Sequence, residues 1–186
     1  MKQDKGELVE LYLESGLRGG RILCRQNLIP KPGQYLLAYD PASDDPLAAP
    51  VFNAGSDPGG FLAAPPIPQT WQPGTSLSLR GPLGRGFTLP ASAQCVAFVA
   101  LGETFARLKP LLMAVLEQNA SVVLVSKLEL PDLPPEVEIQ SVSSLPEITG
   151  WADYLAIDVE RESLPGLRER LEIREQTNFP YEAQTL

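Results

Sequence analysis

The chain changes character near residue 90, and this change limits the folds it can adopt more than any other feature of the sequence. Before it, short stretches with strand patterns are separated by clusters of proline and glycine. After it, apolar runs alternate with stretches of helical periodicity. The first pattern predicts a small antiparallel β-barrel or sandwich, and the second predicts a parallel sheet with right-handed crossovers. We therefore expect two domains, residues 1–90 and residues 91–186, the second ending in a C-terminal tail.

The first half contains several short strand candidates. Strands are expected over residues 7–14, 20–26, 34–39 and 76–80. The first two flank a glycine-rich turn and predict a hairpin, and polar and apolar side chains alternate in the last. Residues 41–73 are rich in proline, alanine, aspartate and glycine, so only a weak strand is expected there, at residues 49–54.

The second half has stronger signals. Strands are expected over residues 94–101, 121–126, 136–142 and 153–158. A helical stripe runs from Phe105 to Leu116, but Pro110 lies inside it, so the helix either begins close to Leu108 or kinks there. A last helix is expected over residues 163–173, with Pro165 in its first turn.

The composition excludes several kinds of site. The chain has no histidine, which removes the usual general base and the commonest ligand of transition metals. Its two cysteines, Cys24 and Cys95, cannot make a four-cysteine zinc or iron–sulfur site. Both lie in apolar, strand-like runs, so we expect buried, reduced thiols. We predict no metal and no iron–sulfur cluster.

The charge pattern and hydropathy limit the partners and the location. The net charge is −8, and the 15 basic residues are scattered, so nucleic-acid binding is not expected. No apolar run approaches the roughly 18–20 residues that span a bilayer, so we expect no membrane insertion. The N-terminal sequence MKQDKGELVE is charged and lacks the apolar core of a signal peptide, which predicts a cytoplasmic protein.

Two glycine-containing motifs occur in the first half. The sequence PGQY, residues 32–35, ends a turn and opens a strand, and GPLGRGF, residues 81–87, follows the strand at 76–80. The glycines of the second motif allow positive φ and close backbone approach, and Pro82 fixes one turn. On these grounds the loop either approaches a ligand or simply joins the two domains tightly.

The order of these motifs resembles the ferredoxin reductase-like family. PGQY, then Pro-Gly at residues 73–74, then GPLGRGF and an apolar strand follow one another as in that family. Within it, the likeness is greatest to the electron-transfer subunits of bacterial dihydroorotate dehydrogenases, over about residues 7–173. The resemblance implies a flavin-binding barrel followed by a Rossmann-like, nicotinamide-binding half, which pass electrons from NAD(P)H through flavin to a partner. The cofactor-binding positions that it implies are Tyr35, Gly81, Pro82, Leu83, Gly84, Gly86, Phe87, Gly102, Glu103 and Thr104.

The barrel half departs from the family at its flavin positions. The family has an arginine that pairs with the FAD pyrophosphate and, shortly after it, a hydroxyl side chain; here Ala49 and Phe52 stand at these positions. A glycine-rich turn that donates backbone N–H groups to the pyrophosphate is expected before Trp71. The chain instead has residues 61–68, with three prolines, and looks shortened by a strand or two. FAD or FMN binding of the usual kind is therefore not predicted.

The second half departs in a similar way. Gly102 is kept after the first strand, but Thr104 stands where the family has a glycine that approaches phosphate. Glu103 either repels an anionic ligand at the helix N-terminus or, with Thr104, is an ordinary residue of a helix start. Residues 174–186 lack the cysteines of the family's [2Fe–2S] segment. NAD(P) binding of the usual kind is therefore not predicted either.

Three functions remain open. The first is a non-catalytic subunit or binding module of a redox system that has lost its cofactors and holds a protein partner or a second copy of itself, with residues 41–68 as the contact surface or as a solvated loop. The second is an NAD(P)H-dependent electron-transfer flavoprotein that binds FAD or FMN in an altered way between residues 81–87 and 102–104. The third is an enzyme of unrelated chemistry using Asp153 and Asp158, which are otherwise caps at the ends of a strand. We assign no catalytic residue.

Overall fold

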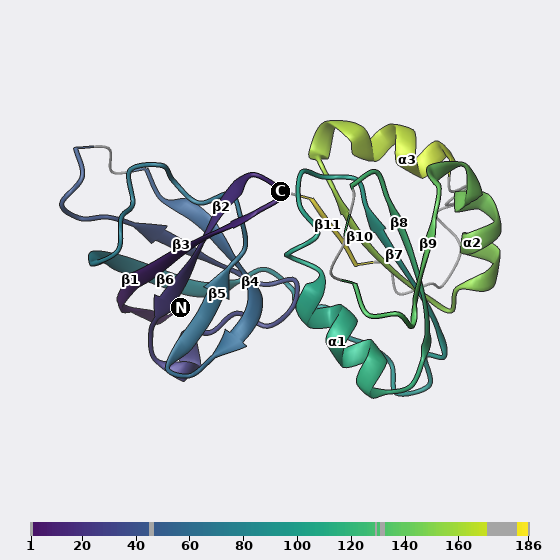
Figure 1. The fold of residues 1–186 in the computed structure, drawn as a ribbon, viewed down its shortest axis with the longest axis horizontal. Coiled ribbons are helices and arrows are strands. Elements are labelled where there is room, and N and C mark those ends of the chain that lie inside the picture. Colours follow the sequence, from purple (N-terminus) through teal and green to yellow (C-terminus); the bar gives the residue numbers. More distant parts are fainter. Residues whose placement is uncertain (1, 45–46, 129, 131–132, 171–181, 186) are drawn as a thin grey trace. The chain divides into compact units, whose positions relative to one another are not determined.

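In the computed structural model, the chain divides into two units, Met1–Phe87 and Thr88–Leu186 (Figure 1). We call them the barrel unit and the sheet unit. The residues that the structure describes are 2–44, 47–128, 130, 133–170 and 182–185. Each unit has its own sheet, so each is described by itself.

Six antiparallel strands close the barrel unit, in the order β1-β2-β5-β4-β3-β6 with β6 paired back on β1. The strands are β1 (Lys2–Glu14), β2 (Leu17–Leu23), β3 (Tyr35–Tyr39), β4 (Ala49–Asp57), β5 (Gly60–Ala63) and β6 (Thr75–Leu83), and a 3₁₀ turn, η1 (Gln26–Leu28), follows β2. The antiparallel barrel expected from the short, regularly spaced strand patterns is confirmed.

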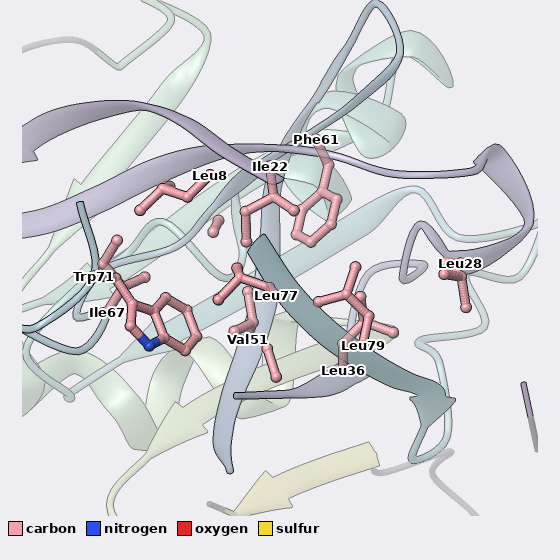
Figure 2. Packing of buried hydrophobic residues seen from close by; sticks show 12 residues of the cluster. Leu8, Ile22, Leu28, Leu36, Val51, Phe61, Ile67, Trp71, Leu77 and Leu79 are labelled. Carbon is pink, nitrogen blue, oxygen red and sulfur yellow. The ribbon is translucent and has the colours of Figure 1, made fainter. Parts of the chain in front are cut away.

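Alternation along the strands builds the barrel core. In β6, Leu77 and Leu79 are fully buried, while Ser76 and Arg80 on either side of them are exposed. Leu8, Ile22, Leu36 and Phe61 join them from other strands, and Ile67 and Trp71 from the connection before β6 (Figure 2). The core thus draws on every part of the barrel, including the proline-rich stretch.

That proline-rich stretch is more regular than its composition predicts. The weak strand expected at residues 49–54 is β4, which runs on to Asp57, and β5 follows after a two-residue turn. Val51, Phe61 and Ile67 are buried in the core. Residues 49–67 therefore form barrel wall and core, and the alternative of a solvated loop over residues 41–68 is wrong for this part.

The sheet unit is a five-stranded parallel sheet in the order β11-β10-β7-β8-β9. Its strands are β7 (Cys95–Ala100), β8 (Ser121–Ser126), β9 (Val137–Gln140), β10 (Tyr154–Val159) and β11 (Glu182–Thr185). Its helices are α1 (Lys109–Glu117), α2 (Leu145–Trp151) and α3 (Leu164–Arg170), with 3₁₀ turns η2 (Val142–Ser144) and η3 (Arg161–Ser163). This order and the covered sheet confirm a Rossmann-like half.

Helices cover both faces of this sheet, which explains its continuous apolar strands. Leu145 and Ile148 of α2 and Leu167 of α3 share one core with the strands, whereas α1 lies on the other side (Figure 1). All six residues of β10 are buried as a result. Among the helices of the described residues, none has the length and apolar character needed to cross a membrane.

The helices differ from expectation at their ends. Helix α1 begins at Lys109 with Pro110 in its first turn, so the first of the two alternatives is confirmed. Phe105 and Leu108 lie in turns before it, although both are buried. Helix α2 was not predicted. The last predicted helix begins at Leu164 as α3, and its expected residues 171–173 lie outside the described residues.

Candidate functional site

The two glycine motifs of the barrel unit lie side by side. Strand β3 pairs with β6 so that Tyr35 is opposite Leu83. Beyond the strands, the N–H of Phe87 donates to the carbonyl of Pro32 (2.8 Å), and the side-chain amide of Gln34 donates to the carbonyl of Gly84 (3.4 Å). The structure therefore brings together Tyr35 and the GPLGRGF loop, the barrel positions that the family resemblance implies.

Contacts within the chain account for the glycines of this loop. Gly81 and Gly84 have φ of +149° and +79°, which disfavours other residues. A side chain at Gly81 would come within 2.8 Å of Leu36, and one at Gly84 within 3.3 Å of the Tyr35 ring. At Gly86 it would come within 3.3 Å of the Pro32 carbonyl. The glycines thus let the loop pack on β3 within the barrel unit. Pro82 and Leu83 beside them are half-buried.

An aromatic pair occupies the place of the family's hydroxyl side chain. Phe52 on β4 is the cross-strand neighbour of Tyr35 on β3, and their ring centroids are 5.6 Å apart with the planes tilted by 37°. Phe52 is 9% exposed. Such pairs stabilise a sheet by about 0.5–1.5 kcal/mol beyond simple burial. Phe52 therefore serves barrel packing and offers no hydrogen bond to a flavin.

Residues 64–68 form the turn that the family resemblance relates to the FAD pyrophosphate, and their backbone N–H groups are already bonded or missing. The N–H of Ala64 donates to the carbonyl of Phe52 (2.8 Å), and the N–H of Ile67 donates to the carbonyl of Arg18 (2.9 Å). The other three residues of the turn, Pro65, Pro66 and Pro68, have no N–H. None of the five residues from 64 to 68 therefore has a backbone N–H available to a ligand.

Two neighbouring side chains, Ala49 and Asn53, also make their contacts within the barrel unit. Ala49 packs against the barrel core and supplies no charge. The amide of buried Asn53 donates to the carbonyl of Pro30 (2.9 Å) and accepts from the N–H of Gly55 (2.8 Å). The residues present here do not fit an FAD pyrophosphate, which needs a guanidinium or several free N–H groups.

The turn after β7 in the sheet unit holds the remaining predicted residues. Glu103 is exposed, and Thr104 is 1% exposed, its hydroxyl accepting from the N–H of Ala106 (3.0 Å). Helix α1 begins only at Lys109, so both expectations that placed Glu103 and Thr104 at a helix start are wrong. A side chain at Gly102 would meet only Arg107, at 3.7 Å, so close packing does not require this glycine.

An ion pair that sequence reasoning missed lies at the same edge of the sheet. Arg107 Nε is 3.2 Å from Asp158 Oδ2, and the two side chains are 15% and 11% exposed. Burial raises the pKa of the Asp158 carboxyl, and the charge of Arg107 opposes this effect. In the sequence, the one sign of this ion pair was Arg107 itself, a charged residue between Ala106 and Leu108, which are both buried.

Asp153 and Asp158 do not form a carboxylate pair. Asp153 precedes β10, where it accepts from the N–H of Gln94 (2.9 Å), whereas Asp158 lies near the other end of that strand. Asp153 is thus the strand-end cap expected as its simplest role, and Asp158 is an ion-pair partner. The proposed two-carboxylate chemistry has no geometric basis.

The barrel also carries an open groove of about 630 Å³. It is lined by Lys5, Gly6, Glu7, Leu23, Cys24, Arg25, Gly59, Gly74 and Ser76. Ser76 lies near the start of β6, whereas the GPLGRGF motif begins at the other end of that strand, so the groove is not the predicted site. Burial, and secondly the charge of Asp4, raises the pKa of Cys24 to about 11, which makes this thiol a poor nucleophile.

The cysteines differ somewhat from expectation, because Cys24 and Cys95 are free thiols but are half-buried rather than buried. Within the described ranges, no three cysteine, aspartate or glutamate side chains cluster as metal ligands.

No protein-family model matches the chain, and no curated protein matches it in sequence. Solved structures share its fold. One is the ferredoxin reductase of carbazole 1,9a-dioxygenase, with a TM-score of 0.72 and 15% identity over 92% of this chain and 65% of that one. A second is the siderophore-interacting protein from Acinetobacter baumannii, with a TM-score of 0.63 and 17% identity over 95% and 86%.

A third is ferredoxin-NADP+ reductase from Plasmodium falciparum, with a TM-score of 0.64 and 12% identity over 94% of this chain and 91% of that one. The chain spans only 63–65% of the two carbazole dioxygenase reductase structures. The neighbours are thus ferredoxin reductase-like at low identity, and at such identities the likeness shows the fold alone. The special likeness to dihydroorotate dehydrogenase subunits stays a prediction.

Proposed function

We propose that this chain is a ferredoxin reductase-like protein without working cofactor sites, which acts as a non-catalytic subunit or binding module of a redox system. The fold is suited to electron transfer, because reductases built on it carry such reactions. The occupied turn at residues 64–68 carries the proposal: two of its N–H groups bond within the barrel, and three positions are proline.

The energetic cost argues against tight flavin binding. Each charged hydrogen bond that is lost costs about 1.5–3 kcal/mol of affinity. Ala49 replaces the arginine, and the turn offers no replacement donor, so several such bonds are missing at once. Affinity should fall by several orders of magnitude, since each 1.4 kcal/mol is tenfold.

The partner is proposed to be another protein or a second copy of this chain. The part of residues 41–68 that lies outside the barrel wall is the connection between β3 and β4. Leu47 in this connection is 79% exposed. The described residues of this connection are the candidate contact surface that the proposal retains.

One observation favours a second candidate function, that of an electron-transfer flavoprotein. Tyr35 and the GPLGRGF loop adjoin one another, as a flavin-binding barrel requires. An electron-transfer flavoprotein using NAD(P)H and an altered FAD or FMN site is therefore the alternative that the experiment has to separate.

The test is flavin retention by the purified native protein. Its absorbance spectrum is recorded as isolated and again after excess FAD or FMN has been added and the unbound flavin removed. We expect no flavin bands above those of a sample unfolded in urea and treated in the same way. Retention of close to one flavin per folded chain, with bleaching by NADH or NADPH, would establish the flavoprotein instead.

A further inference from the structure

Strand β9 forms one open edge of the parallel sheet. It pairs with β8 on one side, and none of the strands in the described part of the chain pairs with it on the other. Such an edge presents backbone N–H and carbonyl groups to which a further strand can bond. Ile139, in the middle of β9, is 54% exposed. The edge therefore offers both hydrogen bonds and an apolar side chain to a partner.

One hydrogen bond indicates which residues of β9 direct their backbone groups outward. The N–H of Val137 donates to the carbonyl of Pro134 (3.0 Å), so it points away from β8. Every second residue of a strand bonds to the same side, so the backbone groups of Ile139 point outward as well. Ser141 continues this alternation, because it directly follows β9 with extended φ and ψ of −77° and 160°.

Two of these outward groups are already bonded within the chain. The N–H of Val137 is bonded to Pro134, and the carbonyl of Ser141 accepts from the N–H of Ser144 (3.0 Å). The outward groups that remain are the carbonyl of Val137, the N–H and carbonyl of Ile139, and the N–H of Ser141. The described residues supply no partner for these remaining groups.

A second copy of β9, antiparallel to the first about a two-fold axis at Ile139, matches all the remaining groups. The two Ile139 residues exchange both of their hydrogen bonds, and the N–H of each Ser141 meets the Val137 carbonyl of the other copy. The one bond left out of such a ladder would join the Val137 N–H to the Ser141 carbonyl, and these are the two groups already bonded within one chain. The edge is thus complementary to itself.

The side chains suit the same register. Glu138 lies opposite Gln140 of the second copy, and no carboxylate lies directly opposite another. Within one chain, the amide of Gln140 already donates to the carboxylate of Glu138, so the two groups can form the same bond across the axis. On the other face of the strand, the two exposed Ile139 side chains meet at the axis.

We propose that β9 is a self-complementary interface through which two copies of this chain dimerise, with their parallel sheets joined into one continuous sheet. Only a short strand is buried, so monomer and dimer exchange with concentration. The inference rests on the proposed function only in taking a second copy as the partner. Flavin retention is a property of the barrel unit, so failure of either proposal can be recognised separately.

The first experiment measures the mass of the native protein by sedimentation equilibrium from micromolar to millimolar concentration. We expect it to rise from the mass of one chain toward that of two. Gln140→Lys places a cation opposite Glu138 at both ends of the pair and should lower the dissociation constant at least about twofold, whereas Gln140→Glu should raise it as much. Gln72→Lys and Gln72→Glu are the matched controls, because they change the net charge equally at an exposed glutamine of the barrel unit.

Two results of this experiment would overturn the proposal. One is a protein that stays monomeric at millimolar concentration, which would leave the edge of β9 to a strand of another protein. The other is an equal effect of the substitutions at Gln140 and Gln72, which would show that net charge, and not the register of β9, controls association.

A second experiment tests the register by crosslinking in a Cys24→Ser/Cys95→Ala background. Ile139→Cys should give a disulfide-linked dimer on mild oxidation, because directly opposite residues of a hydrogen-bonded pair have Cα atoms about 5.5 Å apart. Glu138→Cys is the control, since the two residues 138 lie diagonally across the axis, with Cβ atoms about 7–8 Å apart and beyond the reach of a disulfide. No crosslink at residue 139, or an equal yield at residue 138, would also overturn the proposal.

Discussion

Cys24 is a residue whose surroundings control its chemistry. It is half-buried directly after β2, and burial raises the pKa of its thiol to about 11 from an ordinary value of 9. The thiolate fraction in neutral solution falls about 100-fold, and the higher nucleophilicity of a more basic thiolate recovers part of this loss. In a Cys95→Ala background, we expect Cys24 to react with a disulfide reagent about tenfold more slowly in the folded protein than in urea.

The same shift makes stability depend on pH. The folded protein retains the thiol proton up to pH about 11, whereas the unfolded chain releases it near pH 9. The shifted pKa of Cys24 therefore adds most to the free energy of unfolding below pH 9, and this stabilisation is lost as the pH rises toward 11. The difference in unfolding free energy between Cys95→Ala and Cys24→Ser/Cys95→Ala should decline over that interval. A constant difference, or equal reaction rates in folded and unfolded protein, would contradict the assigned pKa.

The role of a single residue could be predicted where it depends on residues close to it in the sequence. Asp153 could be interpreted as a strand-end cap because such caps bond neighbouring backbone. Arg107 could not be paired with Asp158 from the sequence, since they lie on different strand connections that only the parallel sheet brings together. The donor shortage at residues 64–68 was visible in part: prolines are seen in the sequence, but the bond from Ile67 to Arg18 requires β2.

Glycines in two elements test backbone effects separately from packing. Gly150 lies inside α2, where a Cβ would meet nothing within 4 Å. Gly16, in the β1–β2 turn, has equally open surroundings, but its φ is +78°. Gly150→Ala should therefore raise the free energy of unfolding by about 0.5–1 kcal/mol, because alanine favours helix.

Gly16→Ala should lower the unfolding free energy by about 1 kcal/mol, because alanine is strained at positive φ. Urea unfolding of both variants makes the measurement. If both changes act in the same direction, backbone conformation is not what distinguishes these two glycines.

Whole elements were predictable where the chain itself carries their pattern. Strands β7 and β8 are continuous apolar runs and were found almost to the residue. The first residues of β1, KQDKG, are polar and become strand because they pair with β6. Strand β5 has only four residues, and α2 has seven with Pro146 and Gly150 among them, so neither reaches the length at which periodicity is informative.

At the scale of the whole molecule, the sequence predicted the fold class better than the site. The change of pattern near residue 90 depends on many residues, and an error at one of them leaves the architecture unchanged. A cofactor site depends on a few donors with defined geometry. Tyr35 and the GPLGRGF loop could be placed together from motif order, yet the structure shows that packing against β3 accounts for their glycines.

Two hydrophobic clusters of the described residues, one in each unit, share no residue, which leads to a prediction for the whole chain. One core is built from barrel residues such as Leu79 and Trp71, and the other from residues of the parallel sheet and of helices α2 and α3. The chain has two tryptophans, buried Trp71 in the barrel unit and partly exposed Trp151 in α2. Removing either one leaves a fluorescent reporter for the other unit.

Leu79→Ala should lower barrel stability by about 2–5 kcal/mol, since it leaves a cavity in a fully packed core. In a Trp151→Phe background, the urea midpoint reported by Trp71 should fall. In a Trp71→Phe background, the midpoint reported by Trp151 should stay unchanged, because Leu79 contributes nothing to the second core. If both midpoints fall together, the units unfold as one cooperative structure, and separate cores do not make separate folding units here.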